Sequence, residues 1–343
     1  SVLRNPSSVM QYEIRNTPDV YHHVADGPGR MKFAIRPPAL ARLLIAALLT
    51  VSGTASAGGP STSRPADSTI RFAVIGDYGF AGEPEQDVSN LVRGWNPDFI
   101  ITTGDNNYFF GGADTIDQNI GQYYHDFIYP YTGAYGVGAA WLRFFPALGN
   151  HDWDTPTMWP QPYLDYFTLP DNERYYDFVW GPVHFFALDS DPREPDGIVI
   201  TSTQSLWLQN ALAASTTPWQ LVYMHHPPYS SGGVHGSTLE LQWPYQAWGA
   251  DAVLAGHDHI YERLLHEAIP YFVNGLGGAP VQSLNPQPAP GSQIRFLNDY
   301  GVLLVTGDAG RLTFQFVTRA GLVIDTYSLF KSPRRVYLPI TSR

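Results

Sequence analysis

Five short apolar runs each end in residues of types that bind metals or transfer protons. Runs of this kind, bounded by glycine or polar residues, are typical of strands buried on both faces in a layered α/β fold. Ligands of open α/β sheets bind beyond the carboxyl ends of the strands, so we expect the five following loops to converge. The runs are Ile70–Ile75 before Gly-Asp, Phe99–Thr103 before Gly-Asp, Phe144–Leu148 before Gly-Asn-His, Gln220–Met224 before His-His, and Ala252–Ala255 before Gly-His-Asp-His.

The remaining pattern predicts one domain of strands interleaved with helices. No internal repeat interrupts it, and segment 276–298, rich in Gly, Pro, Gln and Ser, is predicted to be a long surface loop. Further strands are expected at Tyr175–Trp180, Val183–Leu188, Tyr271–Asn274, Tyr300–Thr306, Arg311–Thr318 and Leu322–Leu329. Helices are expected at about 84–94, 116–128, 203–214 and 238–248.

The N-terminal part of the chain has the order of features of an export signal. Met31 precedes a basic stretch, an apolar run from Leu43 to Val51, and small residues ending at Ala57. The run is too short to span a bilayer permanently, so we expect no membrane anchor. Cleavage near Ala57 would leave a periplasmic or secreted protein. The predicted parts are an added or upstream segment without assigned fold (1–30), the signal peptide (31–57), a linker (58–68), the catalytic domain (69–331) and a C-terminal tail (332–343).

Composition excludes several classes of protein. Hydrophobic residues make up 44% of the chain and charged residues 15%, which is not the balance of a disordered chain. There is no cysteine, so disulfides, thiolate-held zinc and a cysteine nucleophile are excluded. The formal charge of −11 argues against general nucleic-acid binding, which needs a basic surface.

The polar residues at the strand ends favour metal chemistry. They comprise two carboxylates, a tyrosine, an asparagine and several imidazoles, without a Ser-His-Asp arrangement for acyl transfer. Mixed oxygen and nitrogen ligands suit two hard or borderline cations bridged by a carboxylate. The glycines before four of these groups are expected to let the backbone turn sharply, so that the next side chain points into the site.

The ordered motifs resemble those of the purple acid phosphatases within the calcineurin-like metallophosphoesterases. The tyrosine of the second motif separates purple acid phosphatases from most other members, and the resemblance extends over about 70–330. It implies a four-layer α/β/β/α sandwich with two mixed sheets. The motifs are GDYG at 76–79, GDNNY at 104–108, GNHD at 149–152, VYMH at 222–225 and GHDH at 256–259.

The same resemblance implies a set of ligand residues for each of two metal ions. Asp105 would bridge them, and His151 and His235 would serve the substrate phosphate or the leaving group. The ferric ion would be held by Asp77, Asp105, Tyr108 and His259. The divalent ion (iron, zinc or manganese) would be held by Asp105, Asn150, His225 and His257.

The implied activity is hydrolysis of small-molecule phosphate monoesters by in-line attack of a metal-bound hydroxide. A phosphodiesterase or nucleotide-specific hydrolase would use the same metals. A non-catalytic secreted binding protein on this fold is a third reading, which the complete ligand set and His151 disfavour. The sequence leaves the physiological ester, the divalent metal, the pH optimum and the oligomeric state undetermined.

Some residues depart from the family pattern or flank it. Asp152 stands where many purple acid phosphatases carry glutamate, and we expect it to orient His151 differently or to admit another substrate. His226 is either a support for a ligand or a structural residue. The aromatic-rich segments 109–142 and 153–174 are expected to shape the pocket. Four aromatic residues flanking the motifs are expected to belong to the core or rim rather than to stack on a substrate, namely Tyr123, Tyr124, Trp153 and Tyr229.

Overall fold

A computed structural model of the chain describes residues 69–331. The predicted upstream segment, signal peptide, linker and C-terminal tail lie outside these residues. Among the described residues, none of the helices is both long and apolar enough to cross a membrane.

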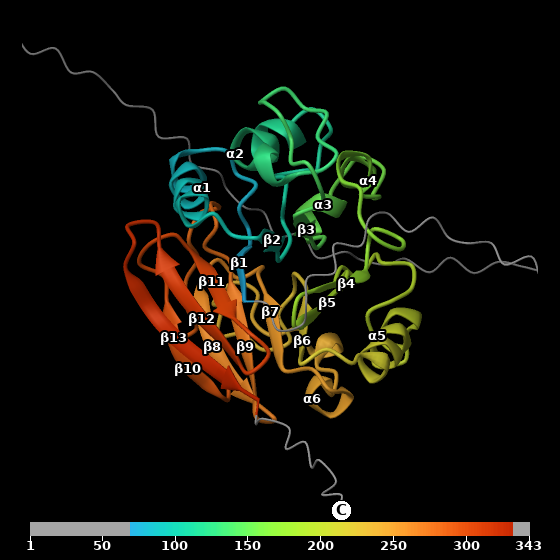
Figure 1. The fold of residues 1–343 in the computed structure, drawn as a ribbon, viewed down its shortest axis with the longest axis vertical. Helices are drawn as coiled ribbons and strands as arrows, with labels where there is room; N and C mark the ends of the chain where they lie inside the picture. The colour runs from blue at the N-terminus through green and yellow to red at the C-terminus, as the bar shows by residue number, and fades with distance from the viewer. Residues whose placement is uncertain (1–68, 332–343) are drawn as a thin grey trace, which may run out of the picture. The chain divides into compact units, whose positions relative to one another are not determined.

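The first of two sheets has six strands in the order β13-β12-β11-β1-β2-β3 (Figure 1). β1 pairs in parallel with β2, and β2 with β3, whereas the pairs on the other side of β1 are antiparallel. The three parallel strands therefore point their carboxyl ends to the same edge. The strands are β1 (Ile70–Ile75), β2 (Phe99–Thr102), β3 (Phe144–Pro146), β11 (Gly301–Gly307), β12 (Arg311–Thr318) and β13 (Val323–Phe330).

The second sheet has seven strands in the order β10-β8-β9-β7-β6-β5-β4. Its centre, from β5 through β6 and β7 to β9, is parallel, and its outer pairs are antiparallel. Both sheets are thus mixed, as predicted. The strands are β4 (Tyr176–Trp180), β5 (Val183–Ala187), β6 (Trp219–Tyr223), β7 (Ala252–Ala255), β8 (Tyr261–His266), β9 (Ile269–Asn274) and β10 (Ser292–Phe296).

Helices lie on the outer sides of the two sheets (Figure 1). α1 contacts β11 of the six-stranded sheet, and α5 packs with α6 beside the seven-stranded sheet. This arrangement confirms the four-layer sandwich. The helices are α1 (Glu83–Trp95), the π-helix η1 (Asp117–Gly121), α2 (Gln122–Tyr124), the 3-10 helix η2 (His125–Phe127), α3 (Asn150–Trp153), α4 (Gln161–Tyr166), α5 (Thr203–Ala214), the 3-10 helix η3 (Leu239–Leu241) and α6 (Tyr245–Trp248).

The main core lies between the sheets and is largely aromatic. Phe72 of β1 meets Phe185 of β5 edge to face, with 5.1 Å between ring centroids. Phe314 of β12 stacks on Phe272 of β9 at 4.7 Å. Such pairs add to the free energy gained by burying apolar area, and they join the two sheets directly. A second cluster, with Leu208 of α5, covers the other face of the seven-stranded sheet.

Three predicted segments differ from the structure, and the first is the helix expected at 116–128, which consists of η1, α2 and η2 in succession. The predicted loop 276–298 contains β10, which pairs with β8 at the sheet edge and packs Ile294 and Phe296 against the core. The predicted helix 238–248 is divided into η3 and α6. Pro244 separates them, since its ring prevents a continuous helix.

Candidate metal centre

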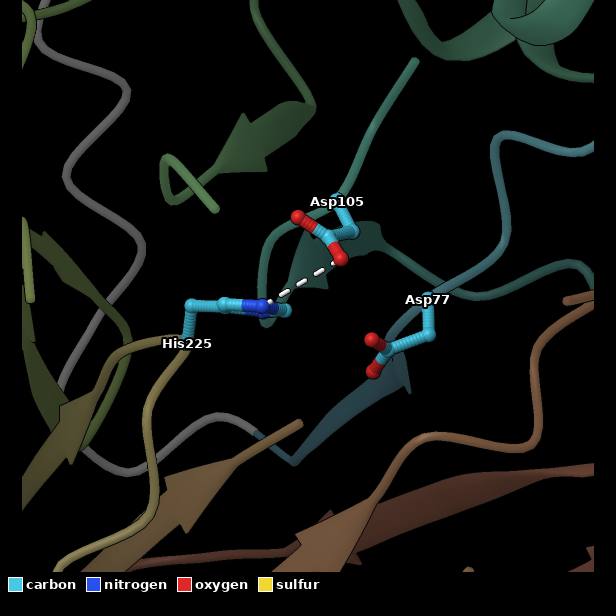
Figure 2. Close-up of side chains that lie close together, drawn as sticks. All are labelled: Asp77, Asp105 and His225. Carbon is cyan, nitrogen blue, oxygen red and sulfur yellow. Dashed lines mark ion pairs between the residues drawn. The ribbon is translucent and has the colours of Figure 1, made fainter. Parts of the chain in front are cut away.

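The loops that follow β1, β2, β3, β6 and β7 bring all seven predicted ligand residues into one cluster, in which Asn150 and His257 are half-buried and the others are buried. Asp77, Asp105 and His225 form its middle, with one potential ligand atom from each lying within 4.8 Å of the others (Figure 2). Asp77 and His225 are completely buried. The two sheets contribute to the cluster jointly, so it depends on their packing.

Three of the polar residues themselves adopt left-handed backbone conformations. Asp77 has φ 55°, Asp105 φ 52° and His257 φ 70°. The sequence predicts that the preceding glycines make these turns. Gly104 does have a positive φ of 90°, but in the other two loops the left-handed residue is Asp77 or His257 and not the glycine before it. Gly76 serves a different purpose, because a Cβ there would lie 2.1 Å from Thr103 Oγ1. Non-glycine residues in this conformation are uncommon and concentrate at functional sites.

One half of the cluster is formed by Asp77, Tyr108 and His259. The Tyr108 hydroxyl lies 3.2 Å from Asp77 Oδ1 and 3.1 Å from His259 Nε2. His259 Nδ1 lies 2.7 Å from the Pro280 carbonyl, so Nδ1 carries the hydrogen. In neutral His259, Nε2 then presents a lone pair to Asp77 Oδ1 at 3.3 Å.

The other half is formed by Asn150, His225 and His257. His225 Nδ1 faces the Thr103 carbonyl at 2.9 Å, which again leaves Nε2 with the lone pair in the neutral ring. That nitrogen lies 3.0 Å from Asn150 Oδ1 and 3.0 Å from His257 Nδ1. This half therefore also brings together lone pairs that can bind a cation.

Asp105 connects the two halves. Its Oδ2 lies 2.9 Å from the Tyr108 hydroxyl and 3.3 Å from His225 Nε2. Carboxylate, amide and imidazole lone pairs that face one another in a buried place need a proton or a cation between them. Imidazoles oriented by backbone carbonyls are the usual arrangement of metal-binding histidines. The donor set therefore fits two cations that share Asp105.

The pKa values reflect the concentration of opposite charges. Burial lowers the pKa of His225, but the carboxylates of Asp105 and Asp77 outweigh it and raise that pKa to about 10. Burial raises the pKa of Asp105, but His225, His151 and His257 outweigh it and hold that pKa well below its usual range. Burial and the neighbouring imidazoles lower the pKa of His257. The carboxylates of Asp105 and Asp77 thus stabilise a positive charge at His225.

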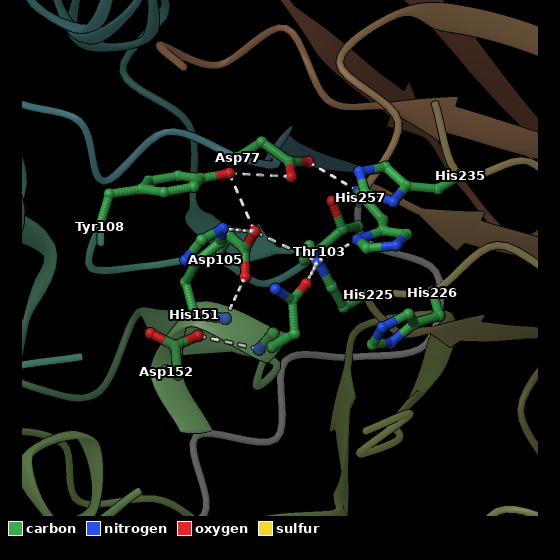
Figure 3. Close-up of polar contacts among 12 residues, drawn as sticks. Asp77, Thr103, Asp105, Tyr108, His151, Asp152, His225, His226, His235 and His257 are labelled. Atoms are coloured by element: carbon green, nitrogen blue, oxygen red, sulfur yellow. Dashed lines mark hydrogen bonds and ion pairs between the residues drawn. The ribbon is translucent and has the colours of Figure 1, made fainter. Parts of the chain in front are cut away.

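His151 stands at the edge of the cluster (Figure 3). Its Nδ1 lies 2.7 Å from the Phe109 carbonyl and must carry the hydrogen of that bond. Its Nε2 lies 4.0 Å from Asp105 Oδ2, so this nitrogen faces the cluster. The side chain is 28% exposed, which leaves it accessible to a bound molecule.

His235 lies on the other side, against His257. The two ring centroids are 4.0 Å apart, and His235 Nε2 lies 3.4 Å from Gln282 Nε2. Burial of part of its ring lowers the pKa of His235. The structure therefore places both predicted catalytic histidines beside the cluster, but at different halves of it.

A sixth strand-end loop, after β5, supports the site and was not singled out from the sequence. Ser190 Oγ accepts from the backbone N–H groups of His225 (3.2 Å) and His226 (2.8 Å). His226 Nδ1 also lies 2.9 Å from this hydroxyl, so His226 supports the position of its neighbour. Arg193 donates to the Asn150 carbonyl at 3.0 Å. The signal was present, because Asp189-Ser190-Asp191 follows a predicted strand.

Asp152 points away from the cluster and joins two of its loops. Its Oδ2 accepts from the Gly149 N–H and from Asn106 Nδ2, both at 2.8 Å. The Asn106 N–H donates to the same carboxylate at 3.2 Å. Burial, followed by the charge of Asp105, raises the pKa of Asp152 to about 7. Its contacts lie in the loop bases, and the His151 imidazole is oriented instead by Phe109.

Comparison with known proteins agrees with this geometry. The calcineurin-like phosphoesterase family model matches residues 70–261, more than half of the chain. Human tartrate-resistant acid phosphatase type 5 is 26% identical over 280 residues, which cover 69% of this chain and 82% of the human protein. Purple acid phosphatase 15 of Arabidopsis thaliana is 28% identical over 239 residues, covering 59% of this chain and 42% of the plant protein.

Two solved structures share the fold. The purple acid phosphatase from yellow lupin seeds superposes with a TM-score of 0.65 at 19% identity, covering 79% of this chain and 55% of the lupin chain. GAP50, the anchor in the inner membrane complex of Plasmodium, superposes with a TM-score of 0.60 at 19% identity, covering 78% and 90% of the two chains. One fold thus serves proteins with different descriptions, so activity has to be argued from the site.

Proposed function

The chain belongs to the calcineurin-like phosphoesterase family as a purple acid phosphatase-like hydrolase, and on this basis we propose that it hydrolyses small-molecule phosphate monoesters with two metal ions. The observation that carries the proposal is that Asp105 connects two halves of the cluster, each of which presents lone pairs that can bind a cation. Phosphate esters are anions, and none of the seven ligand residues of the described cluster is a lysine or an arginine. Cations bound there would supply that positive charge.

Each half of the cluster suits a different ion. The phenol of Tyr108 and the carboxylate of Asp77 are hard oxygen donors, which favour a trivalent ion such as Fe(III). Asn150, His225 and His257 offer amide and imidazole donors, which suit divalent iron, zinc or manganese. Asp105 would bridge the two ions, and His259 would complete the Fe(III) half.

When bound, the two ions would neutralise the phosphate and activate a water molecule for in-line attack on phosphorus. Other residues of the chain fix the positions of the ligand side chains. The carbonyls of Thr103 and Pro280 fix the ring orientation of His225 and His259. Ser190 fixes the backbone between His225 and His226, which limits movement of the divalent half.

His151 would deliver a proton to the leaving group. With Nδ1 committed to the Phe109 carbonyl, the second proton of the imidazolium sits on Nε2, which faces the cluster. Transfer of that proton to the departing alkoxide oxygen would leave neutral His151 in the same orientation. His235, beside His257, would contact the phosphate from the divalent side.

We further propose that the protein is exported. The support is the order of basic stretch, apolar run and small residues in 31–57. Expression of the full chain with its own N-terminus, followed by N-terminal sequencing of the protein recovered outside the cytoplasm, tests this. A mature N-terminus near Gly58 is expected, and retention of the uncleaved chain in the cytoplasm would contradict it.

The proposed reaction is tested by comparing p-nitrophenyl phosphate with its bis-ester on the metal-reconstituted chain. We expect kcat/KM for the monoester to exceed that for the bis-ester, because two cations neutralise a dianion more effectively than a monoanion. The Asp105→Ala variant, measured in parallel, should be inactive toward both. Higher kcat/KM for the bis-ester would identify a phosphodiesterase, and turnover of neither ester by a metal-loaded chain would refute hydrolysis of these compounds.

A further inference from the structure

Two phenylalanine side chains are exposed directly beside the candidate metal centre. Phe109 is 56% exposed and Phe110 is 70% exposed, although both follow the buried Tyr108. Phe80, from the loop after β1, packs edge to face on Phe109 with 5.3 Å between ring centroids. We refer to Phe80, Phe109 and Phe110 as the aromatic platform.

The aromatic platform adjoins the group that would protonate the leaving alcohol. The ring centroid of Phe109 lies 6.3 Å from that of His151, and the ring of Tyr108 lies 4.4 Å from His151. The backbone carbonyl of Phe109 also holds His151 Nδ1. The alcohol part of an ester whose leaving oxygen faces His151 would therefore lie close to Phe109.

The loop that carries Phe109 and Phe110 of the aromatic platform is fixed at both ends. Asn107 Nδ2 donates to the Gly112 carbonyl at 2.8 Å, and the Gly111 N–H donates to the Asn107 carbonyl at 3.1 Å. Gly111 has φ 53°, and a Cβ there would lie 2.6 Å from the Asp152 carbonyl, so the loop rests closely on α3. Preorganised aromatic groups lose little conformational freedom when they bind a ligand.

The opposite side of the cluster has a different character. His257 is flanked by His226 and His235, with ring centroids 4.3 Å and 4.0 Å away. The charged pair of Arg193 and Asp154 does not belong to this side alone, because Asp154 Oδ2 also lies 3.7 Å from His151 Nδ1. The ring neighbours of His257 are thus imidazoles, whereas His151 has the aromatic rings of Tyr108 and Phe109 beside it, and Phe110 extends this carbon surface with its ring centroid 6.5 Å from that of Phe109.

From the exposure of Phe109 and Phe110 and the position of Phe109 beside His151, we propose that the aromatic platform is a binding subsite for the leaving group, which selects phosphate monoesters of flat aromatic alcohols. This inference rests on the proposed function and names its substrate class. The aryl ring of the ester packs against Phe109 and Phe110 while its phosphate lies at the metal centre. Esters of small aliphatic alcohols lack this contact.

The test compares an aryl ester with an alkyl ester in matched variants of the full, metal-reconstituted chain. The ratio of kcat/KM for phenyl phosphate to that for glycerol 2-phosphate is measured in wild type, Phe109→Ala and Phe110→Ala. Each substitution is expected to reduce this ratio about 2- to 10-fold, the range of one aromatic contact. Phe109→Ala keeps the backbone carbonyl that orients His151. Phe330→Ala, which removes an equally exposed phenylalanine at the end of β13, should leave the ratio unchanged.

A binding measurement separates this inference from the proposed reaction. Calorimetric titration with phenylphosphonate and methylphosphonate needs no turnover, and wild type is expected to bind the phenyl compound several-fold more tightly. Both alanine variants should lose this preference. A preserved binding preference without hydrolysis would refute the proposed reaction and leave the subsite standing. Equal binding of the two compounds, binding of neither, or an unchanged ratio in both variants would overturn the subsite.

Discussion

Replacement of Asp152 by alanine is expected to destabilise the protein more than most single substitutions. The carboxylate accepts from three buried N–H donors, namely the Gly149 N–H, the Asn106 N–H and Asn106 Nδ2. A buried donor left without a partner costs ~1–3 kcal/mol. Three such donors give a simple total of ~3–9 kcal/mol. Entry of water and local relaxation reduce this, and we expect a loss of ~3–5 kcal/mol in the free energy of unfolding.

The assay is guanidinium denaturation of the metal-free protein, followed by tryptophan fluorescence. Metal is removed so that ligand binding does not alter the apparent stability. The expected loss corresponds to a decrease in melting temperature of roughly 6–20 °C. Asp114→Ala is the matched control, because Asp114 is an exposed aspartate in the neighbouring loop. A change below ~1 kcal/mol for Asp152→Ala would refute the role of Asp152 in joining the two loops.

Three other predictions concern single residues. His151→Ala should lower kcat by roughly 10²–10⁴-fold with unchanged metal content, and loss of metal would show that His151 is a ligand. Tyr108→Phe should remove the visible absorption band of the iron-loaded protein, because that band requires the phenolate, whereas an unchanged spectrum would exclude contact with iron. Burial raises the pKa of Glu85 well above its ordinary 4.5, and neither carboxylate oxygen has a hydrogen-bond partner among the described residues. The folded protein therefore holds this proton more tightly than the unfolded chain and loses stability as the pH rises above 4.5. Glu85→Gln should thus stabilise the protein at pH 8 more than at pH 4.5 in denaturant titrations, and an equal effect at both pH values would contradict this.

The sequence predicted the parts of the site that depend on strand ends. Ile70–Ile75 and Ala252–Ala255 are strands with the predicted bounds, because apolar runs bounded by glycine leave few alternatives to a buried strand. The loops after them carry Asp77 and His257, and the parallel order of the central strands brings together the strand-end loops within each sheet. Convergence within each sheet could therefore be predicted from strand order, whereas the meeting of the two sets of loops depends on the packing of the two sheets.

Other parts of the site could not be predicted because they depend on tertiary contacts. β10 is a five-residue strand in a segment rich in Gly, Pro, Gln and Ser, and it is stabilised by pairing with β8 and by the contacts of Ile294 and Phe296 with the core. The flanking aromatics Tyr123, Tyr124 and Trp153 are buried in the core, as expected, and Tyr229 stacks on His266 with 3.7 Å between ring centroids. Two neighbouring phenylalanines, Phe109 and Phe110, are exposed instead. Local sequence does not distinguish these outcomes, since both groups are apolar and lie near motifs.

The central claim is that the two halves of the cluster, connected by Asp105, each hold a cation. Its most direct test is the metal content of the full chain after reconstitution with iron and zinc and removal of unbound metal. We predict two metal ions per chain for wild type, loss of both in Asp105→Ala, and retention of one in His257→Ala, since the His257 imidazole contacts His225 of the divalent half and the variant keeps the backbone N–H that donates to Asp77. One ion or none in wild type, or two ions in Asp105→Ala, would contradict the account.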